Sequence, residues 1–331
     1  MRSPGLSLNS RKFIKNRISR FKKEVGNTKL MNRSPSIAVV CQIRRLGRQL
    51  SGFLFVAPAF LWLLMILLIP FLLSIYLSLT NSTAGTWGTF IGLENYRNLL
   101  GSQIFRRTFL NSLVFTAASI GLKTTIGTAL ALLLNQKLRG RKFFRGATLL
   151  PWIAPASLST LAWLWIFNPV FGVANQSLKG LGLIRADVPW LSQPTLAMLC
   201  VILVNTWRGT PFFVITVLAG LSSVPQQLYE AAKVDGAGTW IRFLHVTLPL
   251  IQPILIIVVL FSTIMTFSDF QIVYILTNGG PANSTHLFAT LAYQVGMTGG
   301  NTGGGATILL FMFPFLALLI YLQLRIRGGD F

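Results

Sequence analysis

Long apolar stretches separated by short polar connections dominate this chain. Each stretch is close to the 20 or so residues that a helix needs to cross the hydrocarbon core of a bilayer. Prolines interrupt some of them, and membrane helices tolerate proline because neighbouring helices satisfy the freed carbonyls. The pattern predicts six spans, at about residues 53–79, 109–134, 147–167, 196–221, 250–276 and 306–324.

The composition supports a membrane protein. Hydrophobic residues make up 53% of the 331 residues and charged residues only 11%, with a mean hydropathy of +0.63. A soluble domain of this size would carry about 25% charged residues. We therefore predict an all-α polytopic membrane protein with six transmembrane helices.

Basic residues are concentrated next to particular spans. The net charge is +22, and 13 of the 29 Lys and Arg residues lie within the first 50 positions. The segment "QKLRGRKFFRG" after the second span and the C-terminal end carry more of them. The positive-inside rule explains this arrangement, so no nucleic-acid partner is expected, and both termini are predicted to be cytoplasmic.

The chain is expected to contain a basic cytoplasmic tail, residues 1–48, and a transmembrane domain, residues 49–331. Ile14, Ile18 and Phe21 have helical spacing, which would suit an amphipathic helix on anionic lipid. A partly disordered tail that fixes the orientation is the preferred interpretation. No cleavable signal peptide is expected, because the first apolar run begins only near Phe53.

The segment between the fourth and fifth spans, about residues 222–249, is polar enough to lie outside the bilayer. Ser223 and Thr239 are helix-capping residue types, and Gly236 can end a helix in a left-handed turn. The segment therefore predicts two short helices on the cytoplasmic side. On periodicity alone, an interfacial hairpin that merely joins two spans would be the simpler interpretation.

The residues of this segment resemble a known family. "EAAKVDGA", followed by "LP" eleven residues beyond "DGA", resembles the signature loop of membrane subunits of bacterial ATP-binding-cassette (ABC) importers. "FIGLENY", "GRKFFRGATLLPWIAPASLSTLAWLWIF" and "LTNGGPANST" extend the resemblance to sugar permeases of the maltose and glycerol-phosphate type, and to the first of their two permeases. It implies a type I ABC importer permease fold with a cytoplasmic EAA coupling helix.

The resemblance also implies the partners. Glu230, Ala231, Ala232, Asp235 and Gly236 match the positions that dock on a separate ATPase. The expected complex contains a second permease, two ABC ATPase subunits and an extracytoplasmic binding protein, in the inner membrane of a bacterium, with lipid around it. The simpler alternative is that the two acids cap and solvate a helix, while the alanines and the glycine keep it compact.

Two polar stripes in the fourth and fifth spans could line a site for a sugar. Polar groups at that depth are costly and therefore point to function, and the spacing places each stripe on one helix face. In the family resembled here, positions in these spans contact substrate. The predicted substrate-binding residues are Asn205, Arg208, Gly209, Phe212, Ser262, Thr266 and Asp269.

Some of these polar residues have alternative interpretations. Arg208 and Asp269 could equally form a structural ion pair, or Arg208 could contact a lipid headgroup. Phe212 stands where the maltose-type family has a tyrosine, and the side chains of the fifth span also differ from that system, so the identity of the cargo stays open. Lys123 lies in the middle of the second span and should face the bundle, a partner helix or a water-filled crevice.

The chain offers no recognisable catalytic or metal site. Cys41 and Cys200 give neither a disulfide framework nor metal spacing, and His245 and His286 stand alone. Asp269 is the one acid clearly within a hydrophobic segment. "GLKTT" lacks the spacing of a phosphate-binding loop. ATP is thus expected on partner subunits, and this chain is expected to be a transport subunit that needs no cofactor.

Two other functions were weighed. A secondary transporter driven by an ion gradient would suit broken helices and intramembrane polar groups, but it would not need the signature loop. A membrane-embedded enzyme, such as a lipid-linked sugar transferase, would need acids or metal ligands clustered at one membrane face. The sequence leaves open which sugar, polyol glycoside or glycerol phosphate is carried.

Overall fold

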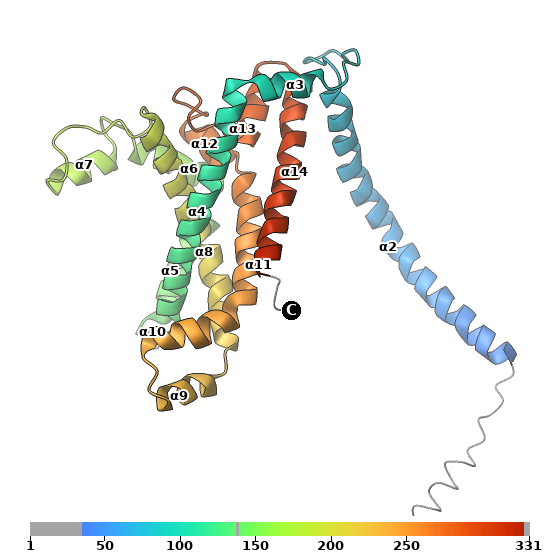
Figure 1. The fold of residues 1–331 in the computed structure, drawn as a ribbon, viewed down its shortest axis with the longest axis horizontal. Coiled ribbons are helices and arrows are strands. Elements are labelled where there is room, and N and C mark those ends of the chain that lie inside the picture. The colour runs from blue at the N-terminus through green and yellow to red at the C-terminus, as the bar shows by residue number, and fades with distance from the viewer. Residues whose placement is uncertain (1–34, 137–138, 328–331) are drawn as a thin grey trace, which may run out of the picture. The chain divides into compact units, whose positions relative to one another are not determined.

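The computed structural model describes residues 35–136 and 139–327, with side chains for residues 56–136 and 139–325. The expectations for residues 1–34, including the amphipathic helix, lie outside this part of the chain. The described residues form the α-helices and π-helical turns shown in Figure 1. In chain order they are α2 (Pro35–Ser78), α3 (Glu94–Gly101), α4 (Gln103–Asn135), α5 (Arg141–Ile153), α6 (Ala156–Ile166), α7 (Val173–Gly180), α8 (Pro194–Ser223), α9 (Gln226–Val234), α10 (Thr239–Arg242), η1 (Phe243–Thr247), α11 (Leu248–Phe267), α12 (Gln271–Leu276), α13 (Phe288–Tyr293), η2 (Gln294–Thr298) and α14 (Thr302–Arg327).

Five helical segments in the described residues are long and apolar enough to cross a membrane, and a sixth span results if the bent pair α5–α6 counts as one. The prediction of an all-α protein with six transmembrane helices is therefore confirmed. The five continuous segments are Val56–Ser78, Gln103–Asn135, Pro194–Ser223, Thr239–Phe267 and Thr302–Arg325.

The chain divides into two compact units, residues 1–70 and residues 71–331. In the first unit, the structure describes the part of α2 from Pro35 to Pro70. The second unit contains the rest of α2 and all the other helices that the structure describes. It is organised around α4 and α8, which pack along each other more extensively than any other pair, while α11 contacts both.

A glycine allows the close approach of α4 and α8. A Cβ added to Gly127 of α4 would lie only 2.5 Å from Cβ of Phe213 in α8. Phe213 is fully buried in a cluster that also contains Val217 of α8 and Ile251 of α11. Small residues at helix crossings are typical of membrane bundles, where association depends on tight packing rather than on exclusion of water.

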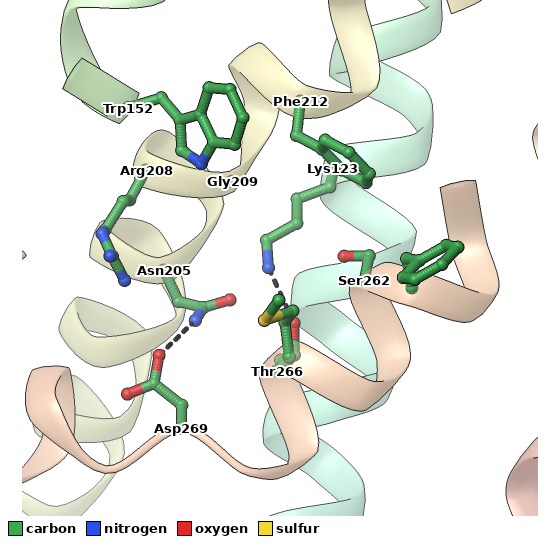
Figure 2. Close-up of a pocket in the computed structure, with 11 residues that line it drawn as sticks. Lys123, Trp152, Asn205, Arg208, Gly209, Phe212, Ser262, Thr266 and Asp269 are labelled. Atoms are coloured by element: carbon green, nitrogen blue, oxygen red, sulfur yellow. Dashed lines mark hydrogen bonds between the residues drawn. The ribbon is translucent and has the colours of Figure 1, made fainter. Parts of the chain in front are cut away.

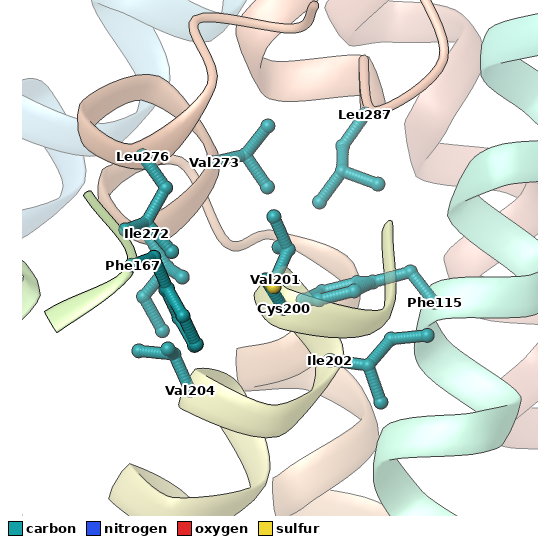
Figure 3. Close-up of a cluster of buried hydrophobic side chains, with 10 residues drawn as sticks. All are labelled: Phe115, Phe167, Cys200, Val201, Ile202, Val204, Ile272, Val273, Leu276 and Leu287. Atoms are coloured by element: carbon teal, nitrogen blue, oxygen red, sulfur yellow. The ribbon is translucent and has the colours of Figure 1, made fainter. Parts of the chain in front are cut away.

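A second buried cluster joins the helices at the other end of α8. Figure 3 shows its side chains, which come from α4, α8, α12 and the segments next to them. Phe115 of α4, Val201 of α8 and Ile272 of α12 are all completely buried there. This cluster packs the short helix α12, which follows α11 in the chain, against α8.

The third predicted span is broken. α5 and α6 meet at an angle of 93°, and Pro155 lies at the break. Proline disfavours the helical conformation for the residue before it, and Ala154 accordingly takes an extended conformation, with φ −65° and ψ 135°. Trp152 lies near the end of α5, directly before this break.

The fifth apolar stretch is also not one continuous helix. α11 ends at Phe267 and α12 begins at Gln271. At the break, Oδ1 of Asp269 accepts a hydrogen bond from the backbone N–H of Ile272 at 3.1 Å. A carboxylate that satisfies a free N–H at the start of a helix stabilises that end, so Asp269 marks the interruption.

Candidate functional site

A cavity of about 380 Å³ lies between α4, α5, α8 and α11, and Figure 2 shows the residues that line it. Its size is within the range of roughly 300–1,000 Å³ that ligand pockets usually have. Polar and charged side chains converge on it from helices far apart in the sequence. The lining residues are Lys123, Trp152, Asn205, Arg208, Gly209, Phe212, Phe261, Ser262, Met265, Thr266 and Asp269.

Lys123 reaches the cavity from α4. Its side chain is only 3% exposed, and its Nζ donates a hydrogen bond to Oγ1 of Thr266 in α11 at 2.8 Å. It passes directly over Gly209 of α8, where an added Cβ would lie 2.5 Å from Cε of Lys123. Gly209 therefore provides the space that the lysine occupies.

Asp269 and Asn205 form a second polar pair across the cavity. Nδ2 of Asn205 donates to Oδ2 of Asp269 at 2.9 Å, while the other carboxylate oxygen accepts from Ile272. Oδ1 of Asn205 is buried and has no hydrogen-bond partner among the described residues. Because buried polar atoms are almost always satisfied, this amide oxygen is available to a bound molecule or water.

Arg208 lines the same cavity, and its guanidinium makes no hydrogen bond to a residue that the structure describes. Among the described residues, Lys179 and Asp187 form an ion pair within 4.0 Å. Arg208 and Asp269 do not approach each other that closely, so they form no ion pair in this structure. The Nε atom of Arg208 is buried and without a hydrogen bond in the described part of the chain. The structural ion pair that the sequence left open is therefore not formed.

Aromatic and apolar side chains form the remaining walls. The rings of Trp152 and Phe212 lie with centroids 6.1 Å apart and inclined by 42°. Phe261 and Met265 add an apolar surface one helical turn apart on α11. A pocket with polar groups at fixed positions and aromatic walls suits a polar ligand that also has apolar faces, as a sugar ring does.

All seven residues predicted to bind substrate from the fourth and fifth spans line this one cavity. The polar stripes were visible because each repeats at helical spacing. Sequence reasoning did not assign Lys123 to the site, although a charged residue in mid-span pointed to a role. It missed Trp152, Phe261 and Met265, because aromatic and apolar residues in an apolar span look like ordinary packing.

The predicted coupling segment forms two short helices, α9 and α10, at the end of the bundle opposite α3 and α13 (Figure 1). Gly236 has φ +77° and makes the turn between them. The expectation that Ser223 caps α9 is wrong, because its hydroxyl donates to the carbonyl of Gly220 within α8. Pro225 occupies the position before α9 and Gly238 the position before α10, so Thr239 is the first residue of its helix rather than its cap.

The surface of this segment is exposed and partly apolar. α9 contains no buried residue, Glu230, Ala231, Asp235 and Gly236 are exposed, and Ala232 is half-buried. The large apolar side chains of Val234 and Trp240 are 87% and 68% exposed. Contiguous exposed apolar residues usually mark a surface that binds another protein or a membrane.

The segment is held to the bundle at its base. The hydroxyl groups of Tyr229 and Thr247 are 3.1 Å apart, which links α9 to η1. Thr247 is buried directly before α11. This contact connects α9 to the start of α11, the helix that carries Ser262 and Thr266.

The described residues contain no group of three or more His, Cys, Asp or Glu side chains that could hold a metal ion. The carboxylate of Asp269 has no second carboxylate beside it in the cavity lining. Paired acids and metal ions are the usual means of glycosyl and hydrolytic chemistry.

The family of binding-protein-dependent transport system inner membrane components matches residues 123–327. This chain belongs to that family. The match includes Lys123, the coupling segment and α14, and it begins after residues 71–122 of the second compact unit. The family identifies the chain as a transport component rather than an enzyme, and with the apolar helices it makes the chain a multi-pass protein of the inner membrane.

Individual relatives span most of the chain. This chain is 34% identical over 274 residues to the trehalose/maltose transport system permease protein MalF of Thermococcus litoralis, and the alignment covers 82% of this chain and 92% of that protein. It is 34% identical over 283 residues to the sulfoquinovosyl glycerol transport system permease protein SmoG of Agrobacterium fabrum, covering 85% and 91%.

The fold is also found in a solved structure. The crystal structure of a bacterial ABC transporter involved in the import of the acidic polysaccharide alginate contains a chain that superposes with a TM-score of 0.76 at 22% sequence identity. The match covers 87% of this chain and 99% of that chain. The type I importer fold predicted from the resemblance is thereby confirmed for this family member.

Proposed function

We propose that this chain is a membrane-spanning permease subunit of an ATP-driven ABC importer, and that it translocates a sugar or sugar-like solute delivered by an extracytoplasmic binding protein. The observation that carries the proposal is the joint presence of an exposed α9–α10 segment at one end of the bundle and a polar cavity at its centre. A transport subunit with no ATP site of its own needs both features.

The coupling segment supports an ATPase partner. Its residues Glu230, Ala231, Ala232, Asp235 and Gly236 fit the docking positions, and the small side chains of α9 would let another surface approach closely. The exposed Val234 and Trp240 give that surface an apolar contact. A ligand-driven change must come from contacts that differ between two states, and docking of ATPases that open and close supplies such a difference.

The cavity supports a sugar as cargo. Sugar hydroxyls need hydrogen-bonding partners, which Asn205, Ser262, Thr266 and Asp269 provide, and sugar rings have apolar faces that pack on aromatic walls such as Trp152. The names of the relatives, which refer to trehalose, maltose and a sulfoquinovosyl glycerol, agree with this class of cargo. Asn205 and Arg208 from α8, Ser262 and Thr266 from α11, and Asp269 from the break that follows α11 are the residues proposed to contact it, with Gly209 and Phe212 shaping the space.

The same proposal includes the partners and the orientation. A second permease with its own coupling segment completes the membrane pathway, and two ATPase subunits bind the two segments. A binding protein delivers cargo at the end that carries α3 and α13. A bacterial alginate ABC transporter of similar fold was solved in complex with alginate pentasaccharide-bound periplasmic protein, which supports a partner of this kind. α9, the C-terminus and the basic tail then face the cytoplasm, in agreement with the distribution of Lys and Arg.

The test uses the assembled importer in proteoliposomes. Ala232→Cys, introduced into α9, should form a cross-link to an ATPase subunit, and Glu230→Ala should reduce both ATP-driven uptake and cargo-stimulated ATP hydrolysis. Lys142→Ala is the control, since Lys142 is exposed on α5 and lies outside the coupling segment. A cysteine at position 232 that reacts with lipid-soluble or external reagents, together with normal uptake by Glu230→Ala, would contradict the proposal.

A further inference from the structure

The candidate cavity carries more positive than negative charge. Lys123 and Arg208 line it as cations, and Asp269 is the one acid among its lining residues. Neither cation lies within 4.0 Å of that carboxylate. In Figure 2 the ammonium of Lys123 and the guanidinium of Arg208 end on either side of the Asn205 side chain. The lining therefore contains two cationic side chains and one carboxylate, which leaves an excess of one positive charge.

The hydrogen-bonding capacity of the cavity is also unbalanced toward donors. A lysine ammonium has three N–H donors and no acceptor, and an arginine guanidinium has five donors and no acceptor. Lys123 gives one donor to Thr266, and the guanidinium of Arg208 has no hydrogen bond to a described residue. Most of these charged donors are thus free to bind a ligand.

The acid, in contrast, already has partners. Oδ1 of Asp269 accepts from the backbone of Ile272, and Oδ2 accepts from Asn205. Its role at the start of α12 explains why it is present without any need to neutralise Lys123 or Arg208. A ligand that only accepts hydrogen bonds and carries negative charge would satisfy the free donors, and a neutral sugar would leave a buried ammonium uncompensated, which is costly.

Lys123 is built into the cavity. Its side chain is only 3% exposed. Gly209 makes room for it, because a Cβ at that position would lie 2.9 Å from Nζ of Lys123. A lysine on a bilayer-spanning helix is expensive unless it has a function. Its ammonium lies among donors and acceptors at the cavity wall, where it can reach a ligand.

We propose, on the basis of the proposed function, that the cargo of this permease carries an anionic group, such as a carboxylate, sulfonate or phosphate on a sugar, which binds between Lys123 and Arg208. The planar guanidinium provides the two parallel N–H groups that such oxyanions accept. Lys123 supplies a second, point-like charge from the opposite helix. The sugar ring packs against Trp152 and Phe212.

The experiment is an import assay in which charge is the only variable. The complete importer with its own binding protein is reconstituted in proteoliposomes, and a mixture of oligosaccharides is offered in matched sets. Within a set, the molecules differ only at C6, which carries a hydroxyl, carboxylate, sulfonate or phosphate. The sugars accumulated in the ATP-dependent reaction are identified by mass spectrometry, and the ratio of anionic to neutral product is measured.

The expected result is accumulation of the anionic members. Arg208→Gln and Lys123→Met should each lower the ratio of anionic to neutral product by about tenfold or more, the size of a lost hydrogen bond to a charged group. Arg208→Lys, which keeps the charge, should retain part of the preference. Because the readout is a ratio within one sample, reduced folding or assembly of a variant does not imitate the effect.

The control for a lost charge elsewhere is Lys142→Gln, because Lys142 is exposed on α5 and does not line the cavity. It should leave the ratio unchanged. Accumulation of neutral sugars with the same ratio in wild type and both cavity variants would overturn the anionic cargo and leave the proposed function intact. Failure to accumulate any sugar in the presence of ATP would overturn both.

A second arm separates a cargo from a lipid headgroup, which has the same oxyanion chemistry. The assay is repeated in vesicles of phosphatidylcholine alone and in vesicles that also contain an anionic lipid. If the anion that binds Arg208 is on the cargo, the ratio should not depend on lipid composition. A requirement for anionic lipid without any preference for charged cargo would overturn the proposal.

Discussion

Lys123 in α4 and Thr266 in α11 are joined by a hydrogen bond of 2.8 Å, although 143 residues separate them in the chain. The bond is possible because Gly209 of α8 has no side chain where the lysine passes. Three helices therefore meet at one polar contact in the middle of the bundle. A rearrangement of any of the three would alter the cavity, which is what a transport cycle requires.

Gly209→Ala is expected to displace Lys123 from Thr266. The new methyl group would lie 2.5 Å from Cε of Lys123, and overpacking of this kind usually costs about 1–3 kcal/mol. Uptake by the assembled importer should fall severalfold, and thermal unfolding of the complex in detergent should occur at a lower temperature. Gly121→Ala on α4 is the matched control, because a Cβ at Gly121 meets nothing within 4 Å.

The turn between α9 and α10 contains two glycines, and comparing them tests the effect of backbone conformation separately from the effect of steric crowding. A Cβ at Gly236 or at Gly238 would meet nothing within 4 Å, but only Gly236 has a positive φ, of +77°. A residue with a Cβ in the left-handed region costs roughly 1–2 kcal/mol. Gly236→Ala should therefore reduce coupled ATP hydrolysis and uptake, whereas Gly238→Ala should be near wild type; equal effects of the two would contradict a role for this turn geometry.

The α4–α8 seam should be sensitive to one added methyl group. Gly127→Ala places a Cβ 2.5 Å from that of Phe213, which is fully buried and cannot move aside. We expect a loss of about 1–3 kcal/mol in stability, measured as a lower midpoint in thermal unfolding of the purified complex. Gly146→Ala, in α5, has open space around its Cβ and should not shift the midpoint downward.

The loop between α12 and α13 should be less stable at acidic pH because of His286. Burial lowers the pKa of His286 below its ordinary value of 6.5, and the side chain of Gln294 opposes this shift. The unfolded loop binds a proton more readily than the folded loop. Stability from the neutral imidazole is therefore complete above pH 6.5 and is lost as the pH falls through 6.5 toward the folded pKa.

Hydrogen exchange checks this pH dependence. Protection factors of the amides from Gly279 to Thr290, corrected for intrinsic rates, should decrease between about pH 7.5 and pH 5. His286→Gln should remove most of the difference. The amides of α9 serve as an internal control, since His286 lies at the other end of the bundle, and an equal decrease there would show that the effect is not due to this histidine.

Much of the fold was predictable because a bilayer restricts the choice of structure. A backbone in lipid must satisfy its own hydrogen bonds, so runs of about 20 apolar residues specify helices, as Leu196–Leu221 within α8 illustrates. The breaks were harder to predict. Pro155 interrupts α5–α6, whereas Pro211 and Pro253 lie inside the continuous helices α8 and α11. Whether a proline breaks a helix depends on the packing around it.

The sequence by itself determined that the chain is a helical membrane protein, which residues lie on the polar faces of α8 and α11, and where the signature segment lies. The first two features follow from local hydrophobicity and helical period, which short stretches of sequence already show, and the third follows from the resemblance of "EAAKVDGA" to a family signature. Only the tertiary structure decided that Lys123 and Trp152 join those faces around one cavity, and that Arg208 and Asp269 do not form an ion pair with each other. Those relationships depend on side-chain packing between distant helices, where a single missing Cβ at Gly209 determines what can meet.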